Sequence, residues 1–482
     1  MRKENLRKTR IVCTIGPASE SEEMLTKLVN AGMNVTRINF SHGGYEENAT
    51  KIDTIKKVRK ALNKPVPLCL DTKGPEIRTG KLESGDEKVK IEEGQKFTFL
   101  YEDVIGNNTK TSISYKGLSE DVKPGASILV DDGAIEFRVD EVIGKDVVCT
   151  AVNSGMLGSR KTVNVRGLKL NLPALSEKDI TDITNGIKAG FDYIFASFVR
   201  RADDLHQIRK LLDENGGQNV KIISKIESQE GIDNFEEILE LSDGIMVARG
   251  DMSVEVPFEK VPVVQKRFIK RCNEVGKPVI TATQMLESMM VNPRPSRADV
   301  SDIANATYDR TTAIMLSGES AMGKHPDLCV ATMDKISRSI EEDLNYWKRF
   351  SNIEIDMSRD DIKGHVAYIA AATAKNLTAD AIIVYTNTGD SARRLAGIGT
   401  ECPILAITDK EKTFYQLGLV WNVTPILVEG KTSIDETIEV GIEKFKSEGI
   451  LEKGDIVVIS GGAKILNNNT ENQIIDGVLK IN

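Results

Sequence analysis

Residues 221–251 read KIISKIESQEGIDNFEEILELSDGIMVARGD, and this stretch holds the pattern that decides the fold. Two short runs rich in β-branched residues, 221–227 and 244–251, enclose a segment with the apolar spacing of a helix. A strand, a crossover helix and a second strand form the unit from which parallel sheets are built. The stretch therefore predicts two neighbouring parallel strands.

The same unit repeats along much of the chain. Short apolar runs alternate with longer amphipathic segments such as 21–31 and 45–62. Eight strands alternating with helices are typical of a closed (β/α)8 TIM barrel, and an open doubly wound sheet is the alternative for the same pattern. The eight predicted strands cover residues 10–16, 35–41, 68–74, 193–199, 221–227, 244–251, 278–284 and 313–319.

The gap between the third and fourth predicted strands has a different pattern. Turn signals such as Pro124-Gly125 and Asp132-Gly133 separate segments in which apolar and polar residues alternate. We expect an all-β domain over residues 75–172, inserted after the third barrel strand at the face where barrel active sites lie. Such an insertion is either a mobile lid or a purely structural appendage.

The last part of the chain returns to alternating helices and strands. Helical segments such as 365–377 and 433–449 are separated by short β-branched runs, which predicts an α/β domain with a parallel core. The expected organisation is a barrel over residues 1–74 and 173–344, an all-β lid over 75–172, and an α/β C-terminal domain over 345–482.

The composition of the chain excludes several classes of partner. A formal net charge of −8 argues against broad binding to nucleic acid or to anionic membranes. The six cysteines are scattered without a Cys-x-x-Cys pair, which fits buried, reduced thiols. The basic start of the sequence lacks the apolar segment of a signal peptide, and no apolar run approaches the ~18 residues of a membrane span. We expect a cytoplasmic protein with no nucleic-acid or membrane partner.

Charged side chains gather at the carboxyl ends of two adjacent predicted strands, where barrel enzymes place their active sites. Lys225 and Glu227 share one face of their strand because side chains alternate with a period of two, and Asp251 ends the next strand. Two such carboxylates suit a hard divalent ion such as Mg²⁺. A lysine beside that ion could neutralise charge on a transferring phosphoryl group, although a salt-bridge network capping the barrel fits the same residues.

A second polar group lies at the ends of the sixth and seventh predicted strands. The Gly250-Asp251 step offers backbone N–H groups at the start of a short helix, and Thr283 offers a hydroxyl. Backbone N–H groups at a helix start attract anions. This part of the rim therefore suits a carboxylate of the substrate.

A third group consists only of hard oxygen ligands. Asn39, Ser41, Asp71 and the carbonyl of Thr72 follow the second and third predicted strands and carry one negative charge in all. From spacing alone, a K⁺ ion and a hydrogen-bonded strand junction fit this set equally well.

The strand-end motifs, taken together, resemble those of the pyruvate kinase family in their order and spacing. The resemblance covers essentially the whole chain and implies a barrel interrupted by a β insertion and followed by a regulatory α/β domain. It implies transfer of the phosphoryl group of phosphoenolpyruvate to ADP, giving ATP and pyruvate in the last step of glycolysis. Mg²⁺ (or Mn²⁺) and K⁺ as cofactors, allosteric control and a homotetramer are implied as well. The motifs are TRINFSHG (36–43), LDTKGPEIRTG (70–80), ISKIES (223–228), MVARGD (246–251), TATQMLESM (281–289) and MLSGES (315–320).

The resemblance also implies a role for each matched residue. Lys225 resembles the lysine that stabilises the transition state, and Arg37 resembles the arginine that holds the substrate phosphate. Glu227 and Asp251 resemble the Mg²⁺ ligands. The other correspondences are a carboxylate pocket at Gly250, Asp251 and Thr283, a K⁺ site at Asn39, Ser41, Asp71 and Thr72, enolate protonation through water, Thr283 and Ser317, and nucleotide contacts at Arg78, Lys161 and His42.

Several segments depart from the family pattern, and two of them lie before the last barrel strand and after the phosphate-cradling loop. Asp309-Arg310-Thr311-Thr312 stands where the family usually has Asp-Gly-x-Asp, and we expect no loss of activity because it precedes a strand. Gly399-Thr400 replaces the Arg-Pro usually found after the helix that follows the phosphate-cradling loop. Asp390 adds negative charge to that loop, so the identity of a phosphorylated effector stays open. The candidate effector contacts are Thr386, Thr388 and Ser391.

Two other classes of protein compete with an active kinase of this family. Another Mg²⁺-dependent barrel enzyme of phosphoenolpyruvate or pyruvate chemistry would lack the β insertion and the candidate potassium ligands. A non-catalytic, metabolite-sensing paralogue would be expected to have lost Lys225, Glu227 or Asp251, and the sequence retains all three. The residues therefore favour an active phosphotransferase.

Overall fold

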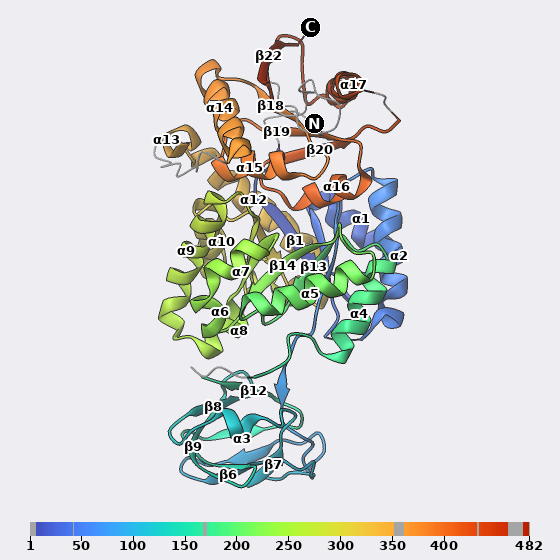
Figure 1. Ribbon diagram of the computed structural model, residues 1–482. Helices are drawn as coiled ribbons and strands as arrows, with labels where there is room; N and C mark the ends of the chain where they lie inside the picture. The colour runs from blue at the N-terminus through green and yellow to red at the C-terminus, as the bar shows by residue number, and fades with distance from the viewer. Residues whose placement is uncertain are drawn as a thin grey trace.

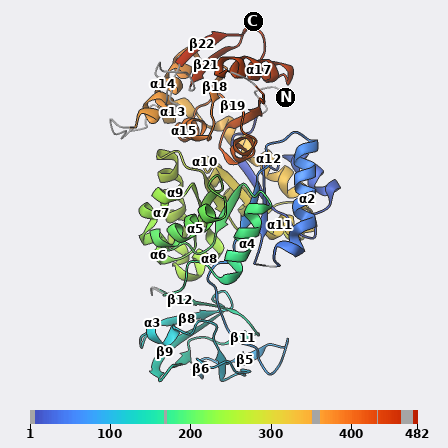
Figure 2. The same ribbon diagram turned by 45° about the vertical axis from the view of Figure 1, so that its right-hand side comes forward.

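The computed structural model describes residues 6–41, 43–166, 171–350, 361–430, 433–460 and 476–481. Three bodies follow one another along the long axis of the molecule (Figure 1). The β-rich body and the C-terminal α/β body lie at opposite ends, with the barrel between them, and a second view shows the same order (Figure 2). In the described part of the chain, no helix is long and apolar enough to cross a membrane.

Eight parallel strands close into the central barrel in the order β1-β17-β16-β15-β14-β13-β3-β2. The barrel rather than the open sheet is therefore correct, and the predicted fold class is confirmed. Each strand ends one to three residues before its predicted end, because the last residues of each run already belong to the loops of the barrel mouth. The strands are β1 Arg10–Thr14, β2 Val35–Asn39, β3 Leu68–Asp71, β13 Tyr193–Ala196, β14 Lys221–Ile226, β15 Gly244–Ala248, β16 Val279–Ala282 and β17 Ala313–Leu316.

Helices surround the barrel strands, and their ends follow local sequence signals. Ser21 caps the first helix by accepting a hydrogen bond from the backbone of Met24, and Gly32 ends it with φ +119°. Ser296 and Asp299 form a capping box at the start of α10. The helices are α1 Glu22–Ala31, α2 Tyr45–Ala61, α4 Glu177–Lys188, α5 Ala202–Glu214, α6 Gln229–Asp233, α7 Phe235–Leu241, α8 Arg249–Glu255, α9 Val261–Glu274, α10 Arg297–Tyr308, α11 Gly318–Ala321 and α12 Pro326–Asp343, with 3₁₀ turns at Phe258–Lys260 and Glu287–Met290.

The barrel interior is packed with apolar side chains from its strands, and one further side chain comes from the C-terminal body. Leu419 is fully buried in the same cluster as Tyr193 and Ile280. The Tyr193 hydroxyl donates to the carbonyl of Gln416 at 2.8 Å. A 3₁₀ turn, Leu417–Leu419, thus closes the amino-terminal end of the barrel, and we call this turn the barrel floor.

The β-rich body lies between β3 and β13 in the chain. Its main sheet has seven strands in the order β4-β12-β8-β9-β10-β6-β7, and β11 pairs with β5 in a separate ribbon. Phe97, Phe99 and Phe137 pack in its core with ring centroids 4.8 to 5.4 Å apart. The elements are β4 Ile77–Arg78, β5 Val89–Ile91, β6 Lys96–Leu100, β7 Lys110–Ser112, a one-turn helix α3 Leu118–Asp121, β8 Ser127–Val130, β9 Ile135–Ile143, β10 Asp146–Ala151, β11 Gly155–Leu157 and β12 Thr162–Val165.

The C-terminal body is built on a five-stranded sheet in the order β20-β19-β18-β21-β22. Four of its strands are parallel, as predicted, and β22 pairs antiparallel with β21 at one edge. Its elements are α13 Tyr346–Phe350, α14 Ile362–Leu377, β18 Ala381–Tyr385, α15 Asp390–Ile398, β19 Ile404–Thr408, α16 Glu411–Gln416, β20 Val423–Leu427, α17 Ile434–Ser447, β21 Ile456–Ser460 and β22 Asp476–Lys480.

Candidate active site

A buried lysine lies at the centre of the barrel mouth. Lys225, near the carboxyl end of β14, places its Nζ atom 2.7 Å from Ser197 Oγ and 3.1 Å from both Asp71 Oδ1 and Glu227 Oε1. Burial alone would lower the pKa of Lys225, but the carboxylates of Asp71 and Glu227 raise it above its ordinary value. The lysine is therefore a fixed positive charge rather than a base.

A second cation lies beside it, on β2. Arg37 donates from Nε to Asp71 Oδ2 at 2.5 Å and from Nη1 to the Thr14 hydroxyl at 2.8 Å. Burial would raise the pKa of Asp71, but Arg37 and Lys225 together hold it below its ordinary value. Asp71 therefore stays ionised and fixes the two cations next to each other.

Glu227 has the most unusual environment of the cluster. Its side chain is 1 % exposed, and its Oε2 atom accepts a hydrogen bond from the backbone N–H of Phe198 at 2.6 Å. Its Oε1 atom is buried and accepts no hydrogen bond of good geometry from the described residues, although Lys225 is near. Burial raises the pKa of Glu227 to about 8, Lys225 lowers it, and the charge of Asp251 adds to the rise.

The arrangement of Glu227 and Asp251 bears on metal binding. Within the described ranges, no group of three or more His, Cys, Asp and Glu side chains could hold a metal ion. Mg²⁺ does not need such a group, because it usually binds through one or two carboxylates and keeps positions for water and substrate. A buried carboxylate oxygen at Glu227 that accepts no hydrogen bond of good geometry from the described residues, next to a second carboxylate, therefore fits a Mg²⁺ site.

The end of β16 carries strained backbone. Thr283 and Gln284 have φ values of +73° and +54°, in the left-handed region that residues with side chains rarely adopt. Thr283 Oγ1 accepts a hydrogen bond from the backbone N–H of Gly250 at 2.9 Å, so the two predicted carboxylate-binding groups are together. Ser317, after β17, donates its backbone N–H to Glu319 at 2.8 Å.

The four predicted potassium ligands lie on two neighbouring strand ends. Asn39 and Asp71 are register partners in the pairing of β2 with β3. Asn39 Oδ1 accepts from the backbone N–H of Ser41 at 3.0 Å, and the Thr72 carbonyl accepts from Ser197 Oγ at 2.6 Å. Amide, hydroxyl, carboxylate and carbonyl oxygens therefore lie on adjacent strand ends, a donor chemistry that fits K⁺.

Two residues of the cluster do not belong to the predicted set. Ser197 follows β13 and contacts Lys225, Asp71 and the Thr72 carbonyl. Thr14 ends β1 and holds Arg37. Both are polar residues at barrel strand ends, so the rule that picked out the other residues would have found them on the first and fourth strands.

Two of the three predicted nucleotide contacts, Arg78 and Lys161, lie on the β-rich body. Pairing of β4 with β12 sets Arg78 near Lys161. Arg78 donates from Nε to Glu76 at 2.9 Å, and Lys161 Nζ lies 2.9 Å from Asp131 Oδ1. His42, the third predicted contact, lies outside the described residues.

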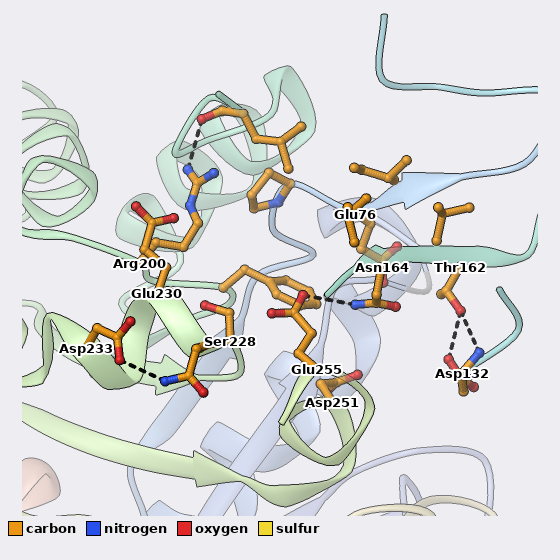
Figure 3. Close-up of a pocket in the computed structure, with 17 residues that line it drawn as sticks. Glu76, Asp132, Thr162, Asn164, Arg200, Ser228, Glu230, Asp233, Asp251 and Glu255 are labelled. Carbon is orange, nitrogen blue, oxygen red and sulfur yellow. Dashed lines mark hydrogen bonds between the residues drawn. The ribbon is translucent and has the colours of Figure 1, made fainter. Parts of the chain in front are cut away.

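A cavity of about 130 Å³ opens between the β-rich body and the barrel (Figure 3). Two hydrogen bonds between its lining residues join the two bodies, from Asn164 Nδ2 on β12 to Glu255 Oε1 on α8 at 3.3 Å and from Arg200 Nη2 to the Leu172 carbonyl at 2.9 Å. Burial raises the pKa of Glu255 to about 7. Asp251 also lines the cavity, so the cavity adjoins the charged cluster of the barrel mouth. Other polar lining residues are Glu76, Asp132, Thr162, Ser228 and Glu230.

The predicted effector contacts lie far from this mouth, in the loop between β18 and α15. Thr386 and Thr388 belong to the loop, and Ser391 lies in the first turn of the helix. The carboxylate of Asp390 pairs with Lys363 Nζ at 2.9 Å. An anion that approached this helix would therefore meet a carboxylate that already has a cationic partner.

A closed barrel whose mouth collects two buried cations and the carboxylates of Glu227 and Asp251, beside a cavity that borders the β-rich body, has the composition of a phosphotransferase site. Family comparisons agree with this class. Residues 6–330 match the barrel domain of pyruvate kinase, and residues 364–475 match its alpha/beta domain. The chain belongs to the pyruvate kinase family, and it is accordingly an enzyme that transfers phosphoryl groups with an alcohol group as acceptor.

Individual relatives are similar over almost the whole chain. A pyruvate kinase of Clostridium acetobutylicum is 48% identical over 470 residues, which are 97% of this chain and 99% of the relative. One of Staphylococcus epidermidis is 48% identical over 472 residues, 97% of this chain and 80% of the relative. The crystal structure of a pyruvate kinase from Cryptosporidium parvum superposes with a TM-score of 0.94 at 36% identity, covering 100% of this chain and 97% of the other.

Proposed function

We propose that this enzyme transfers the phosphoryl group of phosphoenolpyruvate to ADP and releases ATP and pyruvate. The observation that carries the proposal is the buried Oε1 atom of Glu227, which has no hydrogen-bond donor of good geometry among the described residues and lies 3.1 Å from Lys225 Nζ. A carboxylate oxygen that lacks a hydrogen-bond donor and lies next to a fixed cation suits a metal-assisted transfer of an anionic group. Family membership supports the same reaction.

Two ions complete the charge balance of the site. Glu227 and Asp251 would hold Mg²⁺ or Mn²⁺, and bound there the ion would supply a Lewis acid for the phosphoryl oxygens. The candidate K⁺ ligands are Asn39, Ser41, Asp71 and the carbonyl of Thr72.

The chain's own cations act on the phosphoryl group. Lys225 stays protonated between Asp71 and Glu227, so it offers positive charge to the phosphoryl oxygens as the bond to the enol oxygen breaks. Arg37, held by Asp71 and Thr14, binds the phosphate of the substrate. Since both cations are fixed before the substrate arrives, little reorganisation is needed during transfer.

The far side of the mouth orients the organic part of the substrate. The backbone at Gly250 and Asp251 and the hydroxyl of Thr283 form a pocket for its carboxylate, with the strained backbone at Thr283 fixing the position of that hydroxyl. The enolate that remains after transfer takes a proton from water held by Thr283 and Ser317. On the other side, Arg78, Lys161 and His42 would contact the phosphates of the nucleotide.

The rest of the chain has proposed roles of its own. The β-rich body over residues 75–172 acts as a lid on the barrel formed by 1–74 and 173–344, and the body over 345–482 is an allosteric domain. A phosphorylated effector would contact Thr386, Thr388 and Ser391. We further expect a cytoplasmic homotetramer, as the family resemblance implies.

A coupled assay tests the reaction directly. Pyruvate formed from phosphoenolpyruvate and ADP is measured with and without Mg²⁺, while circular dichroism checks that the protein is folded. Turnover that depends on Mg²⁺ supports the proposal. Folded protein that forms no pyruvate at saturating Mg²⁺ and K⁺ would refute it.

A further inference from the structure

An arginine in the turn before β17 reaches into the C-terminal body. Arg310 has a left-handed backbone with φ +63°. Its guanidinium donates hydrogen bonds to the carbonyls of Ala396, Gly397 and Ile398 at 3.1, 2.9 and 3.4 Å. These are the last three residues of α15, the helix that begins at the candidate effector loop.

The contact satisfies the end of that helix. The last four carbonyls of a helix have no partner within it, and a cation there is favoured by the helix dipole. Burial lowers the pKa of Arg310 to about 10, so the guanidinium remains charged at neutral pH. The ring of Trp421 lies 5.1 Å from the guanidinium and adds a cation–π contact. Arg310 therefore caps a helix of a different body.

The residue after α15 is matched to this arginine. Gly399 has φ +82°, and a Cβ atom built on it would lie 2.2 Å from Arg310 Cζ. A side chain at position 399 would therefore require the guanidinium of Arg310 to leave its place at the end of α15. Both positions depart from the family pattern, and in opposite directions, since the pattern has glycine in place of Arg310 and arginine in place of Gly399.

The turn that carries Arg310 also ties two catalytic strands together. The Thr311 hydroxyl lies 2.9 Å from that of Thr281 on β16, and Thr312 Oγ1 accepts from the backbone N–H of Val279 at 3.0 Å. On the other side, Asn273 on α9 donates to the carbonyl of Arg310 at 3.1 Å. Hydrogen bonds therefore hold the segment that caps α15 against β16, and this segment leads directly into β17.

We propose that Arg310 is a positioning residue that couples α15 to β16 and β17. Thr283 and Ser317 follow the carboxyl ends of these two strands. A shift of α15 would therefore move the side of the mouth that binds phosphoenolpyruvate, and it would leave the side that binds the nucleotide in place. The candidate nucleotide contacts Arg78 and Lys161 lie on the β-rich body, whereas the hydrogen bonds described for Arg310 are with α15 and with Asn273 on α9. This reading rests on the roles proposed above for Thr283 and Ser317.

Kinetics and hydrogen exchange of Arg310→Ala and Arg310→Lys test the coupling. Arg310→Ala should raise the KM for phosphoenolpyruvate by about tenfold, the scale of a partly buried helix-end cation, and leave the KM for ADP unchanged. Amides of α15 should exchange about tenfold faster. Arg310→Lys keeps the charge, so its KM for phosphoenolpyruvate and its exchange rates in α15 should both be close to those of the wild type. Tyr193→Phe is the matched control, because it removes one hydrogen bond between the barrel and the C-terminal body away from α15.

Some outcomes would overturn the proposal. One is unchanged exchange of α15 in Arg310→Ala. Another is faster exchange with both KM values as in the wild type, which would make Arg310 purely structural. Equal rises of the two KM values would also contradict it. A wild-type protein without turnover would instead refute the proposed function, and it would leave the exchange result intact.

A double-mutant cycle tests the steric match without any assay of activity. Gly399→Ala should lower the Tm in the wild type because the new Cβ collides with Arg310. In an Arg310→Gly background the collision is absent, and the strain from φ +82° is the same in both backgrounds and cancels. The loss of Tm should therefore be smaller in that background. Equal losses in the two backgrounds would show that position 399 and Arg310 do not share this space.

Discussion

Replacing Lys225 with methionine should almost abolish phosphoryl transfer. The substitution keeps the length of the side chain but removes a charge that lies 2.7 Å from Ser197 Oγ and 3.1 Å from two carboxylates. A fixed cation at a transferring phosphoryl group is worth a factor of about 10³–10⁵ in kcat. That factor corresponds to about 4–7 kcal/mol of the activation barrier. Binding of Mg²⁺ should change much less, because Glu227 and Asp251 remain.

The folded state must be checked alongside the rate. Removing one partner of a buried ion pair typically costs about 3–5 kcal/mol. Here the cost should be smaller, because Asp71 keeps its bond to Arg37 and Glu227, with its pKa raised to about 8, can take up a proton. A thermal melt, measured together with the coupled pyruvate assay, separates lost chemistry from lost fold.

A lysine on the same strand provides the control. Lys221 lies at the amino end of β14 and pairs with Asp243 at 2.9 Å, away from the mouth. Lys221→Met should leave kcat unchanged. Turnover of folded Lys225→Met within tenfold of the wild type would refute the role given to Lys225.

Three further predictions follow from the same geometry. Ser197→Ala should lower kcat by roughly tenfold to a hundredfold, since a hydrogen bond to a charged group is worth about 1.5–3 kcal/mol. Ser224→Ala is its control, because it removes only a bond to Ser242. Equal kinetics for the two variants would contradict the role given to Ser197. Replacing K⁺ with a bulky organic cation at constant ionic strength should lower kcat by about a hundredfold, and indifference to the cation would remove the potassium site. Glu255→Gln should raise the Tm at pH 8 but not at pH 4.5. In the folded state burial raises the pKa of this carboxyl from 4.5 to about 7, so the wild type loses stability as the pH rises across that window. The difference should be about 1 kcal/mol after allowance for partial exposure, and a gain that is equal at both pH values would contradict the assignment.

The sequence predicts the barrel well because its signal is local and repeated. Runs such as 221–227 and 244–251 contain both the apolar residues whose side chains are buried along the strand and the polar residues near its end. Alternation along one run placed Lys225 and Glu227 on one face, and the structure shows their charged atoms 3.1 Å apart. The strand ends were harder to predict, because a polar residue that continues a strand and one that begins a loop look alike in sequence.

The cross-strand contacts could not be read from the sequence in the same way. Ser197 is an ordinary serine in the run 193–199, and only the closure of the barrel brings it to Lys225. The orientation of the Glu227 carboxylate depends on where the Phe198 backbone lies, because the Phe198 N–H donates to its Oε2 atom. Arg310 and Gly399 were visible only as separate departures from a pattern. The contact between them depends on how the barrel and the C-terminal body pack against each other, and no rule based on local sequence predicts that packing.

The barrel floor limits how freely the parts of this chain can be exchanged. Leu419 is carried by the C-terminal body but fills space inside the barrel, next to Tyr193 and Ile280. Gly418 beside it approaches the barrel so closely that a Cβ atom would lie 1.8 Å from the carbonyl oxygen of Pro65. Consider a hybrid protein whose C-terminal body comes from a relative. The residue at position 419 would then come from the relative but would pack inside the barrel of this chain. A smaller residue there would leave a void at the base of the strands, and a larger one would push them apart. The two bodies therefore have to be inherited, or engineered, as a matched pair.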